Sequence, residues 1–395
     1  MSGMVWPVLA LCAIGLGLAL PMTALLVRVG HRAGALDSPG AKGHVKELRH
    51  VPNIGGIAIF TAVALPLALG LAAVWLLDAG TIARLAPGIE EHLDRIRETT
   101  PTALAVLIGM TVLHGLGLAD DRRSLGAAIK LGVQIVIASM LAIWFDVRLL
   151  EAVDGWLGLP GVMNQLPSIV MTVLWIVSIT NAVNFLDNMD GLAAGVCAIA
   201  ASLFMAATIL NSQWFIAGTL ALLVGGLLGF LVFNFPLRGG AKIFMGDGGS
   251  LVVGFVLAVL TARTTYYDGS QMDYPLGGGW YAVFMPVIVL AIPLYDFASV
   301  TLIRLRQGRS PFVGDQQHFS HRLVQRGLSK RGAVIVIWAA TAVTGIGGIS
   351  LGSLQGWQAA LVGVQTLLVL CVIALFEHAS RPARSEAETR KGSRA

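Results

Sequence analysis

The sequence predicts an all-α, polytopic integral membrane protein with about 11 transmembrane helices, N-terminus outside and C-terminus cytoplasmic. Only 12% of its 395 residues are charged, about half the share typical of soluble domains, whereas 56% are hydrophobic. The apolar residues form runs of about 20, the length that a helix needs to cross the hydrocarbon core, and the runs recur almost to the C-terminus. These observations exclude an ordinary soluble protein and disfavour disorder and nucleic-acid binding.

The predicted spans, taken in chain order, are eleven apolar runs. The first has no basic segment before it and is long for the apolar core of a signal peptide, so we expect it to be retained as a helix. The eighth is the shortest run. The runs cover residues 4–27, 54–77, 102–119, 129–145, 167–186, 192–210, 213–235, 250–263, 281–303, 333–351 and 356–377.

The lysines and arginines are distributed unevenly between the connectors, which predicts the orientation. With eleven spans, the odd-numbered connectors and the C-terminal tail share one side and hold 22 of the 27 basic residues. Basic residues concentrate on the cytoplasmic side, so this side is predicted to be cytoplasmic. Residues 1–380 then form a single transmembrane domain, and residues 381–395 a charged tail predicted to be disordered. The outside connector 78–101 is predicted to contain a solvated or interfacial helix without chemistry.

Carboxylates at the ends of apolar helices are costly unless paired, so they mark candidate sites. Asp120 and Asp121 end the third span, and two adjacent carboxylates at a membrane boundary indicate a cation or a cationic partner. The alternative is a charged stop at a helix end, neutralised by Arg122 and Arg123.

A second polar cluster ends the fifth span. Asn181, Asn184, Asp187 and Asp190 are spaced three apart and therefore fall along one helix face, and Gly191 follows where the backbone can turn. Such a stripe indicates a binding site. The alternative is an Asp/Asn-rich turn between two spans.

A third cluster opens the eighth span. Glycines surround the carboxylate in Gly246-Asp247-Gly248-Gly249-Ser250, so backbone N–H groups can meet a phosphate and Asp247 can meet a hard cation. The segment is not a Walker A loop, because no Lys-Ser/Thr pair follows at the right spacing. The alternative is a glycine-rich turn in which Asp247 or Ser250 caps a helix.

The fourth cluster is the basic connector from Arg304 to Arg331. Positive-inside bias explains its arginines, but it does not explain His318 and His321, which lie three residues apart in a short polar loop. Two imidazoles are a weak metal signal, and hydrogen bonding to phosphate beside arginines suits this setting better.

All four clusters, with Lys42, His44 and Lys46, are predicted to lie on one face of the membrane. Carboxylates, cations and glycines that converge there indicate a site for a metal-complexed, phosphate-rich ligand, with lipid available laterally. A secondary transporter is the alternative from another class, but its polar groups should lie near mid-membrane in inverted halves. A lipid-carrier binding protein without catalysis is a third reading.

The order of these motifs resembles that of the polyprenyl-phosphate N-acetylhexosamine-1-phosphate transferases, glycosyltransferase family 4. The resemblance covers residues 42–331, and Pro52-x-x-Gly55-Gly56 looks like the family's opening signature. The loop from Ser310 to Leu323 looks closer to the branch that uses UDP-N-acetylglucosamine (UDP-GlcNAc) than to the phospho-N-acetylmuramoyl-pentapeptide branch, which stays the alternative. The former branch has His-x-His-His in this loop, and this chain has Ser320 at the third of those positions.

The resemblance implies an enzyme that transfers an N-acetylhexosamine-1-phosphate, here GlcNAc-1-phosphate, from a UDP-sugar to undecaprenyl phosphate and releases UMP. The product would start a lipid-linked glycan of the cell envelope, such as cell wall or lipopolysaccharide. The implied cofactor is Mg²⁺, with Mn²⁺ as an alternative. The implied partners are the UDP-sugar, the polyprenyl phosphate and membrane lipid, with a homodimer left open, and the implied location is the bacterial inner membrane with the site facing the cytoplasm.

The resemblance also implies roles for individual residues. Asp247 is the implied direct Mg²⁺ ligand, while Asp120 and Asp121 position the metal or the attacking phosphate, and Asp120 is the candidate if a general base is used. The catalytic set is Asp120, Asp121, Asp247, His318 and His321. The substrate-binding set, which would hold nucleotide, sugar and diphosphate, is Lys46, Lys130, Asn184, Asp187, Asp190, Asn234, Phe244, Arg304 and Arg309.

Overall fold

The computed structural model describes residues 2–34, 50–85, 88–89, 92–151, 154, 158, 160–264, 280–310 and 317–378. Every regular element within these ranges is a helix, as the sequence predicts, with three short 3-10 helices named η. The elements are α1 (Ser2–Ala33), α2 (Gly56–Leu76), α3 (Ala79–Leu85), α4 (Leu93–Arg122), α5 (Ala127–Trp144), η3 (Gly161–Gln165), α6 (Leu166–Leu186), α7 (Leu192–Leu210), α8 (Trp214–Asn234), α9 (Asp247–Arg263), η4 (Trp280–Phe284), α10 (Met285–Val289), α11 (Ala291–Arg306), α12 (Phe319–Gln325), α13 (Lys330–Ile349), η5 (Leu351–Ser353) and α14 (Gly356–His378).

The helices form a multi-pass membrane bundle. Within the described ranges, nine helices are long and apolar enough to cross a membrane, and α10 with α11 makes a tenth if this pair is counted as one span. The eighth predicted span is α9, whose 17 residues make it shorter than each of the nine long helices. The eleven predicted spans therefore correspond to nine long helices, one bent pair and one short helix.

The ninth predicted span is bent by 68° between α10 and α11. Pro293 lies in the first turn of α11 and has no N–H, so it cannot donate to the carbonyl of Val289 across the junction. The chain consequently changes direction near Leu290, where a continuous helix was expected.

The predicted connector 78–101 differs from the structure in part. α3 is a short helix within it, but α4 already begins at Leu93, so residues 93–101 extend the third span into a helix of 30 residues. The charged residues of this extension, such as Asp94, lie before the apolar window that defined the predicted span. The helix continues through this polar segment although it contains Pro101, whose missing N–H removes one hydrogen bond from the helix. The predicted tail 381–395 and the basic segment with Lys42, His44 and Lys46 lie outside the described residues.

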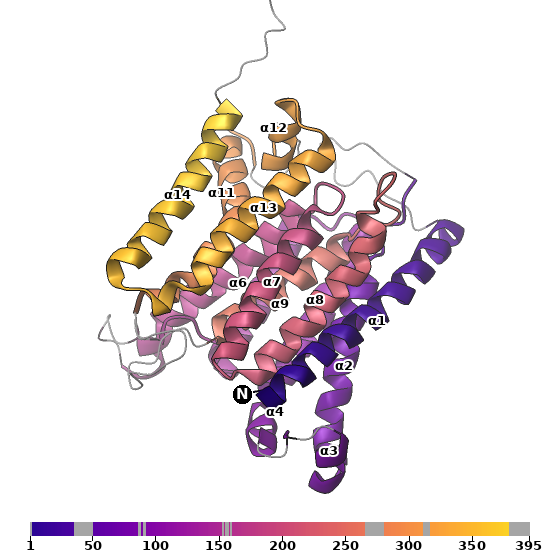
Figure 1. The fold of residues 1–395 in the computed structure, drawn as a ribbon, viewed down its shortest axis with the longest axis vertical. Helices are drawn as coiled ribbons and strands as arrows, with labels where there is room; N and C mark the ends of the chain where they lie inside the picture. Colours follow the sequence, from indigo (N-terminus) through magenta and orange to yellow (C-terminus); the bar gives the residue numbers. More distant parts are fainter. Residues whose placement is uncertain are drawn as a thin grey trace, which may run out of the picture.

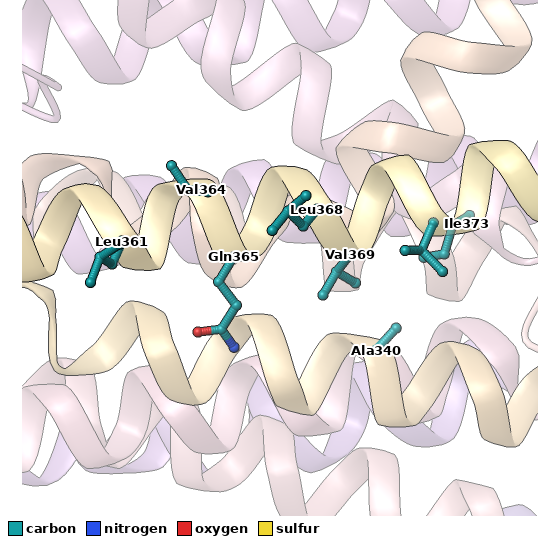
Figure 2. Close-up of a pocket in the computed structure, with 8 residues that line it drawn as sticks. Ala340, Leu361, Val364, Gln365, Leu368, Val369 and Ile373 are labelled. Carbon is teal, nitrogen blue, oxygen red and sulfur yellow. The ribbon is translucent and has the colours of Figure 1, made fainter.

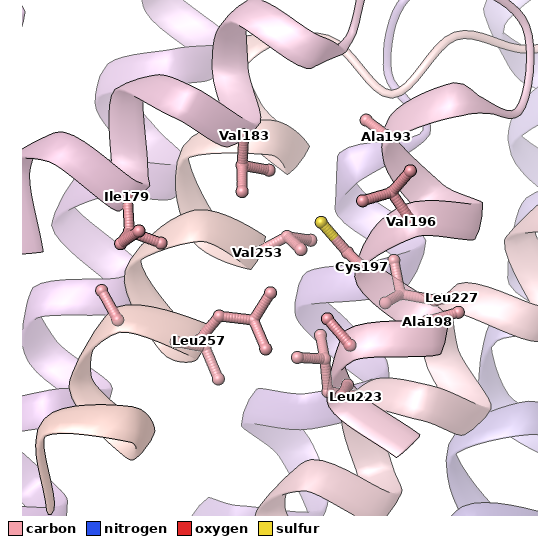
Figure 3. Close-up of a cluster of buried hydrophobic side chains, with 14 of the residues drawn as sticks. Ile179, Val183, Ala193, Val196, Cys197, Ala198, Leu223, Leu227, Val253 and Leu257 are labelled. Atoms are coloured by element: carbon pink, nitrogen blue, oxygen red, sulfur yellow. The ribbon is translucent and has the colours of Figure 1, made fainter. Parts of the chain in front are cut away.

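The core of the bundle surrounds α9. Residues Gly248–Ala262 of this helix are buried, and the helix packs against α4, α6 and α2, while α8 packs against α1 and α7 (Figure 1). Figure 3 shows side chains of α6, α7, α8 and α9 meeting around Cys197. Because α9 is enclosed by other helices, its N-terminus is held firmly at one end of the bundle, opposite the N-terminus of α1.

Candidate active site

The loop that leads into α9 pairs with the segment that leads into α2. The Phe244 N–H donates to the Pro52 carbonyl at 2.8 Å, and the N–H groups of Gly55 and Gly56 donate to the carbonyls of Phe244 and Met245, both at 2.9 Å. The two segments are nearly 200 residues apart in the chain, and this short backbone ladder joins them. It gives the Pro52-x-x-Gly55-Gly56 signature a physical role, because it fixes the approach of the chain to Asp247.

The first turn of α9 lies directly against the backbones of two other helices. A Cβ on Gly117 of α4 would come within 2.4 Å of the Asp247 carbonyl carbon and of the Gly248 nitrogen. A Cβ on Gly56 of α2 would come within 2.3 Å of the Gly249 nitrogen. Only glycine fits at these two positions, and the close contact leaves the start of α9 little freedom to move.

Asp121 caps the N-terminus of α9 from the end of α4. Its carboxylate accepts hydrogen bonds from the N–H groups of Asp247 at 3.0 Å and Gly248 at 3.1 Å, and from the side-chain amide of Asn53 at 2.9 Å. A carboxylate at a helix N-terminus satisfies unpaired N–H groups and interacts favourably with the helix dipole. Asp121 therefore positions the segment that carries Asp247.

Lys130 joins the other two carboxylates of the predicted set. Its ammonium donates to Asp120 Oδ2 at 2.8 Å and to Asp247 Oδ2 at 2.7 Å. Asp120 also accepts from the Leu125 N–H at 2.7 Å. The Asp120 and Asp247 carboxylates carry more negative charge than the single Lys130 ammonium balances, and such an excess attracts cations.

Asn184 connects the second predicted cluster to the third. Its amide nitrogen donates to Asp247 Oδ1 at 2.9 Å and to the Ser250 hydroxyl at 2.8 Å. One helical turn earlier on α6, the Asn181 amide donates to Gln134 Oε1 of α5. Asn181 and Asn184 thus face α5 and α9 from one side of α6, as their spacing of three residues predicts. The helix ends at Leu186, however, so Asp187 and Asp190 lie in the turn after it and the predicted helical stripe of four residues is wrong in this half.

Two further residues of the predicted site hold backbone segments in place. Asn234 accepts from the Gly191 N–H at 2.7 Å and donates to the Ile243 carbonyl at 2.9 Å, and it is almost completely buried. Asp190 Oδ2 accepts from the Ala241 N–H at 2.9 Å. These bonds tie the turn after α6 to the loop after α8, beside Asp187, the C-cap residue of α6.

The histidine-bearing helix α12 docks on the end of α6. The Ser320 hydroxyl donates to Asn188 Oδ1, and the His318 ring meets the Phe185 ring edge to face with 5.7 Å between centroids. The buried Arg304 guanidinium lies over the same Phe185 ring, 5.3 Å from its centroid. Since Phe185 follows Asn184 in the chain, the fourth cluster lies next to the second.

Glu377, near the end of α14, anchors α12 from the other side. Its carboxylate lies 3.0 Å from Arg322 Nε and accepts from the Tyr295 hydroxyl at 3.3 Å, while Arg326 donates to its carbonyl oxygen. Arg322 also donates to the Ser299 hydroxyl at 2.9 Å. The short helix is therefore fixed to α6, α11 and α14.

The structure brings most of the predicted site together. Direct contacts join Asp120, Asp121, Asp247, Lys130 and Asn184, and α6 connects this group to His318 and Arg304.

Three predicted residues are less directly placed. His321 is half-buried on α12, Phe244 is half-buried beside Asp247 in the chain, and Arg309 is exposed beyond the end of α11. Lys46 falls among the residues that the structure does not describe.

Two buried residues near the site were not singled out from the sequence. His114 of α4 donates through Nδ1 to the Gly248 carbonyl at 2.7 Å and stacks on Phe60, and Asp296 of α11 accepts hydrogen bonds from His318 and from the Phe319 backbone. Both stand inside runs that were assigned as apolar spans. A polar or ionisable residue in such a run is a signal that could have found them.

The donor atoms suit Mg²⁺ bound together with a substrate. Within the described ranges no cluster of three or more His, Cys, Asp or Glu side chains forms a complete metal cage. Mg²⁺ is usually held by one or two carboxylates, with water and substrate phosphates completing its shell. Asp120 and Asp247 offer such a pair. The Lys130 ammonium already places a positive charge between their carboxylates.

A separate groove lies between α13 and α14. It is lined by seven apolar residues and Gln365, and Figure 2 shows these side chains along the two helices. None of them belongs to the clusters described above. We assign this groove no part in the chemistry.

Comparison with known proteins gives consistent matches. Residues 103–265 match the model of glycosyl transferase family 4. The chain is 30% identical to a probable undecaprenyl-phosphate N-acetylglucosaminyl 1-phosphate transferase of Bacillus subtilis, over 90% of this chain and 88% of the relative. It is 32% identical to the decaprenyl-phosphate N-acetylglucosaminephosphotransferase of Mycolicibacterium smegmatis, over 87% and 82% respectively. It is 24% identical to the undecaprenyl-phosphate alpha-N-acetylglucosaminyl 1-phosphate transferase of Escherichia coli K12, over 88% and 84%.

Proposed function

Because the chain belongs to the polyprenyl-phosphate N-acetylhexosamine-1-phosphate transferases of glycosyl transferase family 4, we propose that it transfers GlcNAc-1-phosphate from UDP-GlcNAc to undecaprenyl phosphate and releases UMP. Membership of this family makes the protein a phosphotransferase. The alternatives of a secondary transporter and of a lipid-carrier binding protein without catalysis are therefore set aside. The sugar donor, the metal requirement and the release of UMP are the proposed parts.

The observation that carries this proposal is the arrangement around Lys130. One ammonium bridges Asp120 and Asp247, and Asn184 holds the second oxygen of Asp247. Carboxylates, a lysine and an amide at the end of a membrane bundle suit a ligand that carries both a cation and phosphates. Lipid reaches the same site sideways from the bilayer.

The reaction needs positioning and charge neutralisation more than covalent help. An oxygen of the lipid phosphate attacks the β-phosphorus of the donor, the bond from that phosphorus to the bridging oxygen breaks, and that oxygen leaves with UMP. A phosphate monoester, with a second pKa of about 6, is mostly dianionic at neutral pH, so its oxygen needs no general base. Asp120 remains the candidate if a base is used.

Asp247 and Asp120 would hold the metal ion, and Asp121 would hold Asp247 in place. Mg²⁺ bound there with the donor diphosphate would neutralise the negative charge that develops during transfer. When the donor enters, the Lys130 ammonium is free to exchange one carboxylate for a diphosphate oxygen, because its flexible stem allows such a shift. The Lys130 ammonium thereby balances negative charge both in the empty site and in the site that holds the donor.

The remaining predicted residues fall into two groups, those proposed to contact the donor and those whose contacts are with the backbone. Asp187 and Asn184 are proposed to hold the nucleotide and sugar, and Phe244 to stack on uracil. His318 and His321 are proposed to donate to diphosphate oxygens, with Arg304 facing the sugar. Asn234 and Asp190 would act by shaping the loops between them, since both bond to backbone.

The site is proposed to face the cytoplasm of a bacterium, from the inner membrane. Two observations support this: the basic residues are concentrated on the connectors at the site end, and the relatives described above are bacterial. A cytoplasmic site has direct access to UDP-sugars and receives the lipid phosphate from the inner leaflet.

The test is release of UMP by the purified protein in detergent. The reactions contain Mg²⁺, undecaprenyl phosphate and either UDP-GlcNAc or UDP-N-acetylmuramoyl-pentapeptide, with the Asp247→Asn protein as the matched control. UMP that requires lipid, metal and UDP-GlcNAc supports the proposal. UMP formed only from the pentapeptide donor would assign the chain to the other branch. If the folded protein neither releases UMP nor binds either donor, the proposal is wrong.

A further inference from the structure

A buried carboxylate on α11 holds the first catalytic histidine of the proposed site. Asp296 has no exposed surface, and its Oδ2 accepts from His318 Nδ1 at 2.9 Å. Its other oxygen, Oδ1, accepts from the Phe319 N–H at 2.7 Å. One side chain therefore fixes both the imidazole ring and the backbone at the start of α12.

These bonds set the protonation of the ring. An ionised carboxylate can only accept hydrogen bonds, so Nδ1 of His318 carries a proton. The other ring nitrogen, Nε2, has no hydrogen-bond partner among the residues that the structure describes. Nε2 can donate to a phosphate oxygen when the ring carries both protons, and the buried Asp296 is the counter-charge for that form.

The same contacts fix where the ring lies. Asp296 holds it from α11, and Phe185 of α6 meets it edge to face at an interplanar angle of 86°. Phe185 directly follows Asn184, whose amide donates to Asp247. The ring is thus held between α11 and the part of α6 that reaches the proposed metal ligand.

We propose that Asp296 is a positioning residue for sugar-phosphate transfer, which holds His318 in the orientation and protonation state that let Nε2 bind the donor diphosphate. This inference rests on the proposed function, because it acts through a histidine assigned to the diphosphate. At metal sites, removing a carboxylate that orients a functional histidine lowers metal affinity or activity about 10- to 100-fold.

A purely structural role is the competing explanation. Asp296 also accepts from the backbone at the N-terminus of α12, and a carboxylate there would stabilise that helix without acting on His318. The two explanations differ in whether the effect of Asp296 passes through the imidazole.

A double-mutant cycle separates them. Asp296→Asn is made alone and together with His318→Gln, and kcat and KM for UDP-GlcNAc are measured for each protein. Ser299→Ala is the matched control, because Ser299 lies on α11 three residues further and contacts α12 through Arg322 rather than His318. We expect Asp296→Asn to lower kcat/KM about 10- to 100-fold in the wild-type background. In the His318→Gln background it should have almost no further effect, and Ser299→Ala should leave kcat/KM nearly unchanged.

A second measurement does not depend on turnover. In protein labelled with ¹⁵N-histidine, the His318 signals, assigned by their loss in His318→Gln, should show a protonated Nδ1. The inference would be overturned if Asp296→Asn lowered kcat/KM equally in the wild-type and His318→Gln proteins. An unprotonated Nδ1 in the wild type would also overturn it. An inactive wild-type protein would instead contradict the proposed function, so the two failures are distinguishable.

Discussion

At the residue scale, Asp247 is the residue through which α4, α5 and α6 contact the start of α9. Its carboxylate contacts Lys130 of α5 and Asn184 of α6, and its N–H donates to Asp121 of α4. The three polar clusters around Asp121, Asn184 and Asp247 therefore meet at one position. Its replacement is the most direct test of the site.

We expect Asp247→Asn to lower the rate of UMP release at least about 100-fold, a loss comparable to that from removing one key electrostatic contact to a transition state. Asparagine keeps the size of the side chain but removes the charge that faces Lys130 and the proposed metal ion. The measurement is turnover at saturating substrates, with thermal unfolding in detergent as the control for folding. Near-normal turnover would show that Asp247 is not a metal ligand.

Asn234 should behave differently, although it belongs to the same predicted set. Both of its polar groups are bonded to backbone, so Asn234→Ala leaves a buried N–H and a buried carbonyl unpaired. We expect a loss of about 1–3 kcal/mol in stability for each such group, and a lower melting temperature. The KM of the remaining folded protein for UDP-GlcNAc should change little. An unchanged melting temperature with a raised KM would assign Asn234 to substrate binding.

The residues that the sequence could predict share one property. Asp120, Asp247 and Asn184 stand in short motifs whose polar character is visible against apolar surroundings. Asp296 and Glu377 could not be linked to the site, because their partners His318 and Arg322 lie 22 and 55 positions away and only the folded chain brings them together. Asp121 was also singled out from the sequence, but its bonds to the start of α9 follow from tertiary structure alone.

At the element scale, the short helix α9 depends on close backbone contacts. It was predicted as a span from its apolar sequence, but its close approach to α2 and α4 was not. Glycines are frequent throughout this chain, and nothing in the sequence distinguishes one that touches another backbone from one that faces lipid. The structure makes this distinction at Gly117 and Gly115, two positions on the same helix.

We expect Gly117→Ala to lower both activity and thermal stability, whereas Gly115→Ala should change neither. A Cβ at Gly117 would meet the backbone of Asp247 and Gly248 within 2.4 Å, but one at Gly115 would meet nothing within 4 Å. Overpacking of this kind costs about 1–3 kcal/mol or more. UMP release and melting temperature are measured for both proteins. Equal behaviour of the two variants would mean that α9 can move away without loss.

The bend between α10 and α11 was also not predicted. The apolar run 281–303 reads as one span by hydropathy, which does not detect a change of direction. The bend has a structural consequence, because α11 is thereby aimed so that Asp296 and Ser299 contact α12. The local signal for it was Pro293, a residue without an N–H in the first turn of the second helix.

At the scale of the whole molecule, the helical bundle and the order of its spans follow from apolar periodicity and length. Which side of the bilayer carries the site is predicted by charge alone. Ser124, in the turn after Asp121, lies at the site end, and Ser353, between α13 and α14, lies at the other end. Both are exposed serines in connectors, so they form a matched pair for labelling.

We expect a cysteine at position 124 to be labelled only from the cytoplasmic side, and one at position 353 only from the outside. Ser124→Cys and Ser353→Cys are made in a protein whose three native cysteines are replaced, and a membrane-impermeant maleimide is applied to spheroplasts and to inverted vesicles. The positive-inside rule gives the expected sides. The reverse pattern would contradict the proposed cytoplasmic site.

The contact between Glu377 and Arg322 makes the short helix α12 depend on a helix that is synthesised after it. α12, which begins directly after His318 and carries His321, leaves the ribosome well before α14, and until Glu377 follows, the Arg322 guanidinium lacks its buried counter-charge. A nascent chain that ends before α14 therefore has the bonds of α12 to Asp296 and Asn188 but lacks the one that ties α12 to the last described helix. We expect α12 to be fully anchored only when this last described helix has packed against it.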